Sequence, residues 1–575
     1  MAARAQLVDH FFATVFDNRR LFTLLCLKHD CQVAGAVLLL QIAGWRLRSR
    51  SMSIALRLAV AIILAIDILD LAVFALFSQR LSLNNFLRFD HEGSAMIAIA
   101  LDFIAEWKYA LITSAAVSTL IGGFVAARRH HRLGWRGSVI GVLGSMVLIG
   151  VYAWPAQIVY TNDWTYRNVF EIAATSGVLT PYSPAMLEAG RAWAEAQDQS
   201  RRCVPALHTR RNVILVVMES LSTHHSQYLS GLSNWTPRID AIARRNYAYT
   251  DFYANGNNTA FGLISLLTGH TPILALNVRN YGRYRAVDDA LPMRLRKSGY
   301  ESAFLTTGTL GFLSVGQWLT SIGFDYVEGD EAPFYQGMER FNFHAAADEQ
   351  LYARSLQWLQ QKKGPFFLTL LTVSTHPPYM NPLTRERSEE ASFRYADQAF
   401  AKFVETLSER AYFANGGILL LTGDHHDMVP LRAAEIDKFG NSADARVPLL
   451  VLGEGLGLPR LVSGPYQQAD VPISIENMAG ERACFKDREA DLFHPKPSAS
   501  ARCILHQRGD VQDVVDEFCG SQFGQVKLDG DATRALKGSV ANQEALIREI
   551  NAERIGWFLR RQADGSETRQ LPAPL

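Results

Sequence analysis

The sequence predicts a membrane-anchored α/β protein, in which transmembrane helices precede a large domain with a mostly parallel β-sheet flanked by helices. The apolar excess is concentrated before residue 160 of the 575 residues. After that point, short apolar runs alternate with helical patterns, which indicates a parallel sheet with helices on both faces. We therefore expect a transmembrane domain over residues 1–158, a partly helical linker over 159–209 and a globular domain over 210–575.

Four apolar stretches predict the transmembrane helices, at residues 32–45, 53–78, 107–126 and 138–155. A helix needs about 20 residues to cross a bilayer, and the second stretch is long enough by itself. The first stretch is short and must borrow residues from its flanks. Residues 8–27 are interpreted as an interfacial helix or, alternatively, as an additional early span.

The arginines between these stretches predict the orientation of the chain. Three lie between the first and second stretches and four between the third and fourth, so both short loops are expected in the cytoplasm. Everything after the fourth stretch then faces outward. The sequence predicts a multi-pass protein of the inner (plasma) membrane, with its large domain in the periplasm or outside the cell.

Charge and cysteine content narrow the class of protein further. The net charge of +1 gives no indication of a nucleic-acid partner. The six cysteines form no CxxC pair and no Cys/His cluster, which argues against a structural zinc finger. If the large domain lies outside the cytoplasm, four cysteines can form two disulfides of open pairing, and buried free thiols are the alternative. These are Cys203, Cys484, Cys503 and Cys519.

Nearly continuous apolar runs predict the strands of the large domain, as expected when both faces of a sheet are covered. They occupy residues 212–218, 301–306, 366–373, 417–422 and 446–452. Amphipathic patterns between them predict helices at Pro237–Arg245, Ala260–Leu267, Ala347–Gln361 and Phe393–Glu409. After Pro465 the pattern weakens into short strands and helices.

Polar residues follow three of these strands directly. Glu219, His376 and Asp424 come just after the strands near 212–218, 366–373 and 417–422. Ligands of open α/β sheets bind beyond the carboxyl ends of the strands, so these side chains are expected to meet. His425 emerges beside Asp424, and carboxylate oxygen with imidazole nitrogen suits zinc or manganese.

Thr259 lies in the segment NGNNTAFG, at the predicted start of a helix. The positive end of the helix dipole would stabilise an alkoxide there and attract phosphate oxygens. A bound cation lowers the pKa of a hydroxyl further, so Thr259 is a candidate nucleophile. The alternative is that Thr259 is an ordinary N-cap residue.

The remaining polar residues near these strand ends have less defined roles. His376, in the segment VSTHPPY, is a candidate proton donor or phosphate ligand, and the alternative is a loop histidine bonded to the backbone. Ser220 is a rival nucleophile, although no GxSxG motif surrounds it. Four further residues are interpreted as supporting or solvent-facing groups beside the ligands, namely His224, His225, His426 and Asp427.

Taken in this order, Glu219, Thr259, His376 and Asp424–His425 resemble the alkaline-phosphatase/sulfatase superfamily. With the preceding membrane spans, residues 210–480 resemble the lipoteichoic acid synthase-like phosphoglycerol transferases and their phosphoethanolamine transferase relatives. The resemblance implies an alkaline-phosphatase-like catalytic domain. It also implies that Glu219, Thr259, Asp424 and His425 hold a Mn²⁺ or Zn²⁺ ion.

The resemblance further implies a reaction at the membrane. Thr259 would attack the phosphodiester of a phospholipid donor, and the resulting phospho-threonine would pass the head group to a glycan or lipid acceptor. The alternatives are a phosphodiesterase or phosphatase that uses water, or a sulfatase-fold protein without activity. The segment TAFGL at 259–263 lacks the C/S-x-P-S-R pattern of sulfatases, and the region after Ser302 lacks the family's head-group contacts. Phosphoglycerol and phosphoethanolamine therefore both stay open as head groups.

Overall fold

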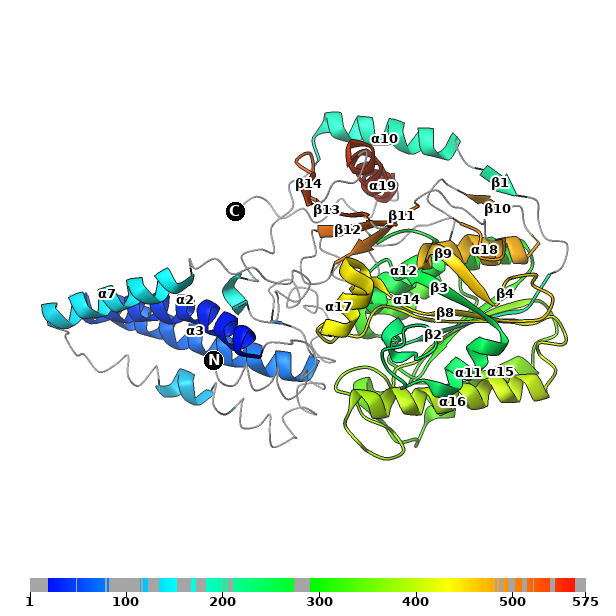
Figure 1. Cartoon of the computed structure of the whole chain (residues 1–575), viewed down its shortest axis with the longest axis horizontal. Helices are drawn as coiled ribbons and strands as arrows, with labels where there is room; N and C mark the ends of the chain where they lie inside the picture. Colours follow the sequence, from blue (N-terminus) through cyan, green and yellow to red (C-terminus); the bar gives the residue numbers. More distant parts are fainter. Residues whose placement is uncertain are drawn as a thin grey trace. The chain divides into compact units, whose positions relative to one another are not determined.

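The structure is a computed structural model of the whole chain (Figure 1). It describes residues 19–47, 49–77, 80–81, 114, 117–122, 134–152, 167–171, 182–199, 202–204, 210–272, 290–480, 483–485, 490–494, 502–508, 514–520, 522–537 and 543–563. The chain divides into two compact units. Unit 1 comprises Met1–Gly177 with Met428–Gly440, and unit 2 comprises Val178–Asp427 with Asn441–Leu575.

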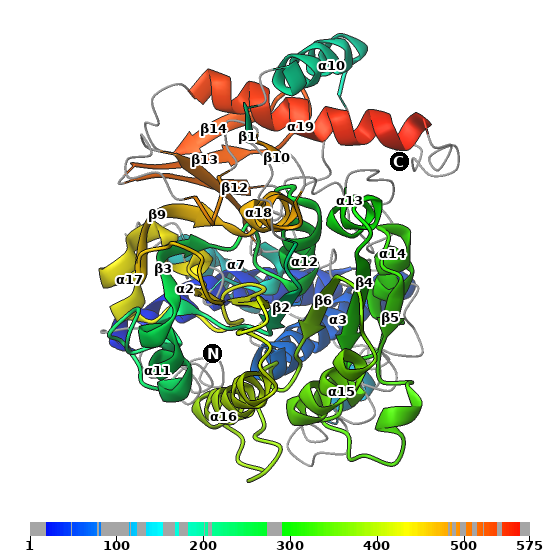
Figure 2. The ribbon, with the colours of Figure 1, turned by 90° about the vertical axis from the view of Figure 1, so that its right-hand side faces the viewer.

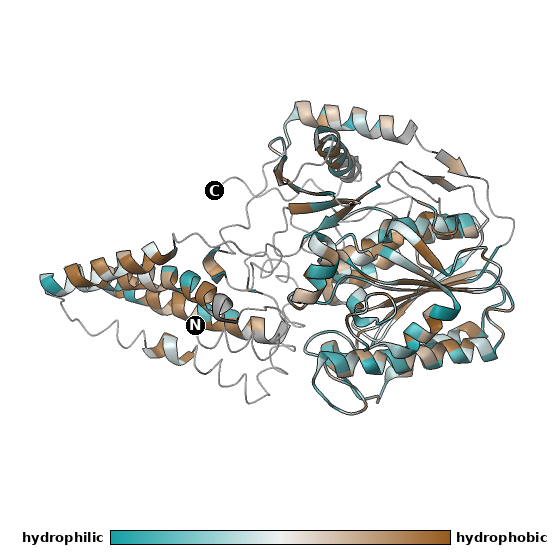
Figure 3. Ribbon diagram, in the orientation of Figure 1, coloured by the Kyte–Doolittle hydropathy of each residue, from teal (hydrophilic) through white to brown (hydrophobic). Residues whose placement is uncertain are grey.

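Unit 1 contains long apolar helices. They are α2 (Arg19–Arg46), α3 (Arg50–Phe77) and α7 (Trp135–Tyr152), and α2 packs against the other two. Figure 3 shows apolar residues along much of all three. In the described part of the chain, Thr23–Arg46 and Arg50–Leu71 are long and apolar enough to cross a membrane, and α7 is shorter. The second segment of unit 1 contains α17 (Ala433–Phe439).

Two details of this unit differ from the sequence prediction. The first apolar helix is longer than expected, because residues 19–27 continue into it; a separate helix over 8–27 is wrong for those residues. Most of the predicted span 107–126 lies outside the described residues, of which 114 and 117–122 are helical.

Unit 2 is built on an eight-stranded sheet with the order β5-β4-β6-β2-β7-β8-β3-β9. Strands β6, β2 and β7 are parallel neighbours, as are β4 with both β5 and β6, whereas β8 runs antiparallel to β7 and β3. The strands are β2 (Val213–Met218), β3 (Tyr247–Tyr253), β4 (Glu301–Thr306), β5 (Tyr326–Glu328), β6 (Phe366–Leu371), β7 (Ile418–Gly423), β8 (Leu449–Leu452) and β9 (Leu461–Gln467). The predicted fold class, a mostly parallel sheet flanked by helices, is confirmed.

Helices cover both faces of this sheet (Figures 1 and 2). One face carries α11 (Pro237–Arg245), α15 (Asp348–Gln360) and α16 (Glu389–Glu409), whose apolar residues form one core with the strands. The other carries α12 (Thr259–Thr268), α13 (Leu291–Lys297) and α18 (Val471–Met478), which contact one another. Helix α14 (Val315–Ser321) packs beside β5. The central strands are buried on both faces, which explains their continuous apolar sequences.

The carboxyl-terminal part of unit 2 forms a second, antiparallel sheet. Its strands are β11 (Cys503–Gln507), β12 (Val514–Cys519), β13 (Gln522–Lys527) and β14 (Arg534–Lys537), in that order. Helix α19 (Gln543–Ala563) contacts β14 and also α10 (Pro184–Gln199), the helix expected in the linker. Strand β1 (Arg202–Val204) pairs with β10 (Ala483–Phe485).

Unit 2 contains two disulfides. Cys203–Cys484 joins β1 to β10, and Cys503–Cys519 joins β11 to β12. Cys26 and Cys31, in α2, are buried and are not disulfide-bonded. The disulfide alternative of the sequence analysis is therefore the one that the structure contains.

Candidate metal centre

The candidate residues lie at the carboxyl ends of three neighbouring parallel strands of the sheet. Strands β6, β2 and β7 are in register, so Met218 lies opposite Gly423 and Val217 opposite Leu371. Glu219 and Asp424 are the next residues after β2 and β7, and both are buried. Parallel strands that end together bring residues 204 positions apart into contact, as the backbone N–H of Ser220 shows by donating to Oδ1 of Asp424 at 2.8 Å.

Ser220 shapes the turn at the end of β2. Its backbone has φ of +58°, a left-handed conformation that is uncommon outside glycine. This turn directs its N–H to Asp424, while its hydroxyl donates to Oε1 of Glu219 at 2.8 Å. Ser220 therefore positions both carboxylates, a role that the sequence analysis did not assign.

Thr259 is the first residue of α12, and Asn258 is its N-cap. The Asn258 side chain accepts a hydrogen bond from the backbone N–H of Phe261 at 3.1 Å. The Thr259 hydroxyl is therefore not needed for capping. Instead its Oγ1 lies 3.2 Å from Oε2 of Glu219 and 3.4 Å from Nε2 of His425. The alternative that Thr259 is an ordinary cap is wrong, because its neighbour has that role.

His425 faces the cluster with Nε2. Its Nδ1 lies 2.6 Å from the carbonyl oxygen of His426, so Nδ1–H donates to that carbonyl and Nε2 is the ring atom that can offer a lone pair to a cation. Nε2 lies 3.5 Å from Oε1 of Glu219 and 3.2 Å from Oδ2 of Asp424. Lone pairs and carboxylates facing one another at such distances repel unless a cation or a proton lies between them.

The pKa values of these three side chains also indicate that the cluster favours a bound positive charge. Burial raises the pKa of Glu219, but the hydrogen bond with His425 and the charges of His376 and His425 outweigh it and lower the pKa to about 2. Burial and the charge of Glu219 raise the pKa of Asp424. Burial opposes the protonation of His425, yet the adjacent carboxylates raise its pKa well above the usual range. A proton on His425 thus occupies the role that a cation would take.

The donor set fits a divalent cation. The ligand atoms of Glu219, Asp424 and His425 all lie within 4.8 Å of one another, and the Thr259 hydroxyl contacts two of the three residues. Oδ2 of Asp424 is buried and has no hydrogen bond among the described residues. Two carboxylates, one imidazole and one hydroxyl suit Zn²⁺ or Mn²⁺. The structure thus brings together all four residues that the sequence analysis selected as metal ligands.

Close backbone packing holds the helix and the strand ends in place. A Cβ atom on Gly262, in α12, would lie 2.2 Å from the carbonyl oxygen of Asp424, and one on Gly423 would lie 2.1 Å from that of Leu221. The Gln468 side chain donates to the carbonyl oxygens of Gly423 and Asp424 at 2.8 and 2.7 Å. The sequence patterns did not predict these contacts, although glycines near the ligands are an indication of close backbone approach.

His376 lies at the border of this centre. Its Nδ1 donates to the carbonyl oxygen of Pro377 at 2.5 Å, and its ring packs edge-on against Phe343 with centroids 4.3 Å apart. Its charge contributes to the lowered pKa of Glu219. The hydrogen bond to the backbone agrees with the interpretation of His376 as a loop histidine, and its role as a proton donor or phosphate ligand stays a prediction.

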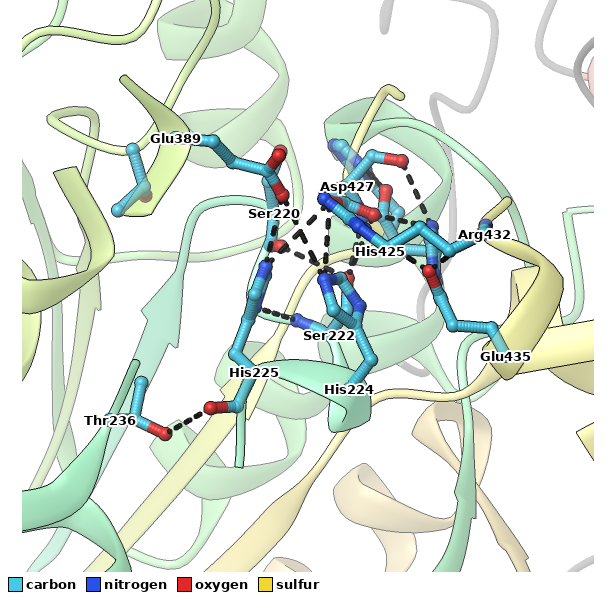
Figure 4. Close-up of polar contacts among 12 residues, drawn as sticks. Ser220, Ser222, His224, His225, Thr236, Glu389, His425, Asp427, Arg432 and Glu435 are labelled. Atoms are coloured by element: carbon cyan, nitrogen blue, oxygen red, sulfur yellow. Dashed lines mark hydrogen bonds and ion pairs between the residues drawn. The ribbon is translucent and has the colours of Figure 1, made fainter. Parts of the chain in front are cut away.

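Four residues interpreted as supporting or solvent-facing are buried: His224, His225, His426 and Asp427. Figure 4 shows the rings of His224 and His225 directed toward Asp427 and Glu389. Their burial rules out the solvent-facing interpretation.

Comparison with known proteins agrees with this fold and geometry. Residues 211–480 match the family model "Sulfatase". A protein of the alkaline phosphatase superfamily from Vibrio parahaemolyticus has 19% identity and a TM-score of 0.53, with 67% of this chain and 97% of that chain covered. Residues 211–480 are therefore similar to the sulfatase family, and their fold is that of the Vibrio parahaemolyticus protein.

Two curated proteins are similar to part of the chain. Lipoteichoic acid synthase 1 of Bacillus subtilis is 24% identical over 382 residues, which is 59% of this chain and 57% of that protein. Phosphoglycerol transferase I of Xanthomonas euvesicatoria is 26% identical over 308 residues, which is 51% and 39%. The chain thus spans about half the length of these relatives. The predicted resemblance to the lipoteichoic acid synthase-like family is confirmed.

Proposed function

We propose that this protein is a membrane-anchored, metal-dependent transferase that moves a phospholipid head group to a glycan or lipid acceptor. The observation that carries this proposal is the Thr259 hydroxyl, which is not used to cap its helix and contacts Glu219 and His425 at 3.2 and 3.4 Å. A threonine placed at a helix N-terminus among cation ligands is suited to nucleophilic attack on a phosphodiester.

In the proposed reaction, Glu219, Thr259, Asp424 and His425 hold Mn²⁺ or Zn²⁺. The cation lowers the pKa of the Thr259 hydroxyl and offsets charge on the phosphate. Thr259 loses its proton to solvent, and its Oγ1 bonds to phosphorus as the bond to the diacylglycerol oxygen breaks. His376 protonates that leaving oxygen. The acceptor hydroxyl then gives its proton to His376 and attacks phosphorus, and Thr259 leaves and regains a proton.

The names of the curated relatives favour phosphoglycerol over phosphoethanolamine as the head group, since both concern lipoteichoic acid or phosphoglycerol. Phosphatidylglycerol is therefore the proposed donor. The proposed acceptor is a glycan or a lipid. Hydrolysis of the phospho-threonine by water is the competing outcome of the experiment below.

We also propose that unit 2 faces the periplasm or the exterior, with the chain anchored as a multi-pass inner membrane protein. The division into a transmembrane part over 1–158, a linker over 159–209 and a catalytic domain over 210–575 belongs to this proposal. Its support is the pair of disulfides in unit 2, because disulfides persist mainly outside the reducing cytoplasm. The outward domain would then meet the lipid donor at the membrane surface.

Thr259→Ala tests whether this hydroxyl is the nucleophile. The full chain, incubated with manganese and vesicles of phosphatidylglycerol, should accumulate a phosphoglycerol adduct on Thr259 that mass spectrometry detects. The variant should show no adduct and a turnover lowered by at least about 10³-fold, because the covalent step is lost.

Thr406→Ala is the matched control, because that hydroxyl bonds within its own helix to the carbonyl oxygen of Lys402 at 2.9 Å. It should behave as the unaltered chain does. Label recovered only in free glycerol phosphate, with no acceptor modified, would show a hydrolase. An adduct on any residue other than Thr259 would contradict the proposed nucleophile.

A further inference from the structure

A second group of metal-ligating side chains lies in unit 2, apart from the four residues of the centre above. His224, His225, Glu389 and Asp427 offer ligand atoms that all lie within 4.8 Å of one another. They come from the short helix η2 (Thr223–His225), the first turn of α16 and the loop after β7. The side chains of the two histidines and Asp427 are at most 1% exposed, and that of Glu389 is 15% exposed.

The distances between these atoms are closer to those between the ligands of one metal ion than to those of hydrogen bonds. Nε2 of His224 lies 3.6 Å from Oδ2 of Asp427 and 3.8 Å from Oε1 of Glu389. Both distances exceed an ordinary N–H···O hydrogen bond, which extends to about 3.2 Å. Ligand atoms about 2.1 Å from a tetrahedral zinc are separated by about 3.4 Å. The observed separations are therefore close to those of a coordination shell.

Asp427 is already oriented for such a role. Its Oδ1 lies 2.7 Å from Nδ1 of His426 and accepts a longer hydrogen bond from the Ser222 hydroxyl, at 3.4 Å. Its backbone N–H donates to the same hydroxyl at 2.7 Å. These contacts fix the carboxylate so that Oδ2 faces His224 and His225, as Figure 4 shows.

His225 has a different role from His224. Its Nδ1 accepts a hydrogen bond from the backbone N–H of Ser222 at 3.1 Å, so the proton of the neutral ring is on Nε2. That Nε2 is buried, has no hydrogen bond among the described residues and lies 3.5 Å from Oε1 of Glu389 and 3.6 Å from Oδ2 of Asp427. It can orient these carboxylates by donating to them, but it cannot offer a lone pair to a cation. Its ring is held by stacking on Phe393, with centroids 3.6 Å apart.

We propose that His224, Glu389 and Asp427 bind a second divalent cation, with zinc as the best match to one imidazole and two carboxylates, and that His225 orients the ligands. The ion would join three segments of the chain. Two of them begin at Glu219 and Asp424, so the ion would fix the loops that carry the first centre. This inference does not depend on the phosphotransfer reaction.

The test compares zinc binding by Glu389→Gln and Glu390→Gln in the full chain. Glu390 is the matched control, because it is the next residue of the same helical turn, is exposed and pairs with Arg394. After removal of metals, zinc is titrated by calorimetry, and the bound zinc is counted by elemental analysis. Glu390→Gln should bind as much zinc as the unaltered chain, and Glu389→Gln should lose one equivalent.

Two further variants separate this site from the first. His224→Asn should lose the same equivalent as Glu389→Gln, whereas Asp424→Asn should lose a different one, so that Glu389→Gln combined with Asp424→Asn loses both. His344→Ala removes an exposed histidine and should change nothing. Circular dichroism establishes that each variant is folded. Full zinc content in folded Glu389→Gln and His224→Asn would overturn the proposal, whatever the result for Asp424→Asn.

Discussion

At the scale of single residues, the first centre depends on how closely α12 approaches the end of β7. Only a glycine permits that approach at position 262, because a Cβ atom there would lie 2.2 Å from the carbonyl oxygen of Asp424. That oxygen belongs to backbone that Gln468 also holds, so it has little freedom to move. The helix would have to shift, and Thr259 would shift with it.

We therefore predict that Gly262→Ala lowers the free energy of unfolding by about 1–3 kcal/mol, as overpacking of a buried site does. It should also weaken metal binding, because Thr259 moves away from Glu219 and His425. Gly364→Ala is the control, since a Cβ atom there meets no atom within 4 Å. Denaturant unfolding and metal titration measure both effects, and unchanged metal affinity in Gly262→Ala would contradict the argument.

Asp348 provides a residue-scale prediction about pH. Its Oδ1 accepts two backbone hydrogen bonds, from Val373 and Ser374, but its buried Oδ2 has no hydrogen bond among the described residues. Burial raises the pKa of this carboxyl to about 6, despite those bonds. Because the folded state binds the proton more tightly than the unfolded state, this group's contribution to stability falls as pH rises through the window between its ordinary pKa and about 6.

Asp348→Asn should remove this dependence. The free energy of unfolding of the unaltered chain, relative to the variant, should drop by about 3 kcal/mol as pH rises from about 4 to about 7. Metal-free protein must be used, because the charge of Glu219 also raises the pKa of Asp348. Urea unfolding at both pH values measures the difference, and an equal difference at the two values would refute the role of Asp348.

At the scale of elements, the sequence predicts the central strands well because both of their faces are buried. The residues of β2, β4, β6 and β7 match the predicted runs within two residues at each end. Strand β3 was missed because Tyr247–Tyr253 mixes polar and aromatic residues and is only partly buried. Glu219 and Asp424 could be predicted because each follows a buried strand. Glu389 begins a helix, and no sequence pattern marks such a position as part of a site. The second cluster could therefore be recognised only from the structure.

Helix caps give an element-scale prediction. Asn258 caps α12 and Ser388 caps α16, each accepting a backbone hydrogen bond at 3.1 Å. Replacing either residue by alanine should lower the free energy of unfolding by about 1 kcal/mol. Asn258→Ala should lower turnover more than Ser388→Ala, because α12 carries Thr259 at its first position, whereas α16 carries Glu389, which is not part of the first centre. Thermal unfolding and transferase assays measure the two effects, and equal turnover in the two variants would show that the cap does not orient Thr259.

At the scale of the whole molecule, the cysteines distinguish the two units. Both disulfides lie in unit 2, and Cys26 and Cys31, which are not disulfide-bonded, lie in α2 of unit 1. Cys203–Cys484 spans 281 residues of sequence and Cys503–Cys519 spans 16. In the chain-entropy account, the longer loop restricts the unfolded chain more, so its loss should cost more stability.

The cysteines therefore report the compartment of unit 2. Acid quenching of cells, followed by alkylation in denaturant and mass spectrometry of the chain, should find two alkylated thiols, those of Cys26 and Cys31, with four cysteines paired. Reduction before alkylation should raise the number to six. Production of residues 178–575 in a reducing cytoplasm is the control, and it should yield reduced cysteines because glutathione keeps thiols unpaired there. Six alkylated thiols in the unreduced native chain would place unit 2 on the cytoplasmic side, where the proposed transfer to an outer acceptor cannot occur.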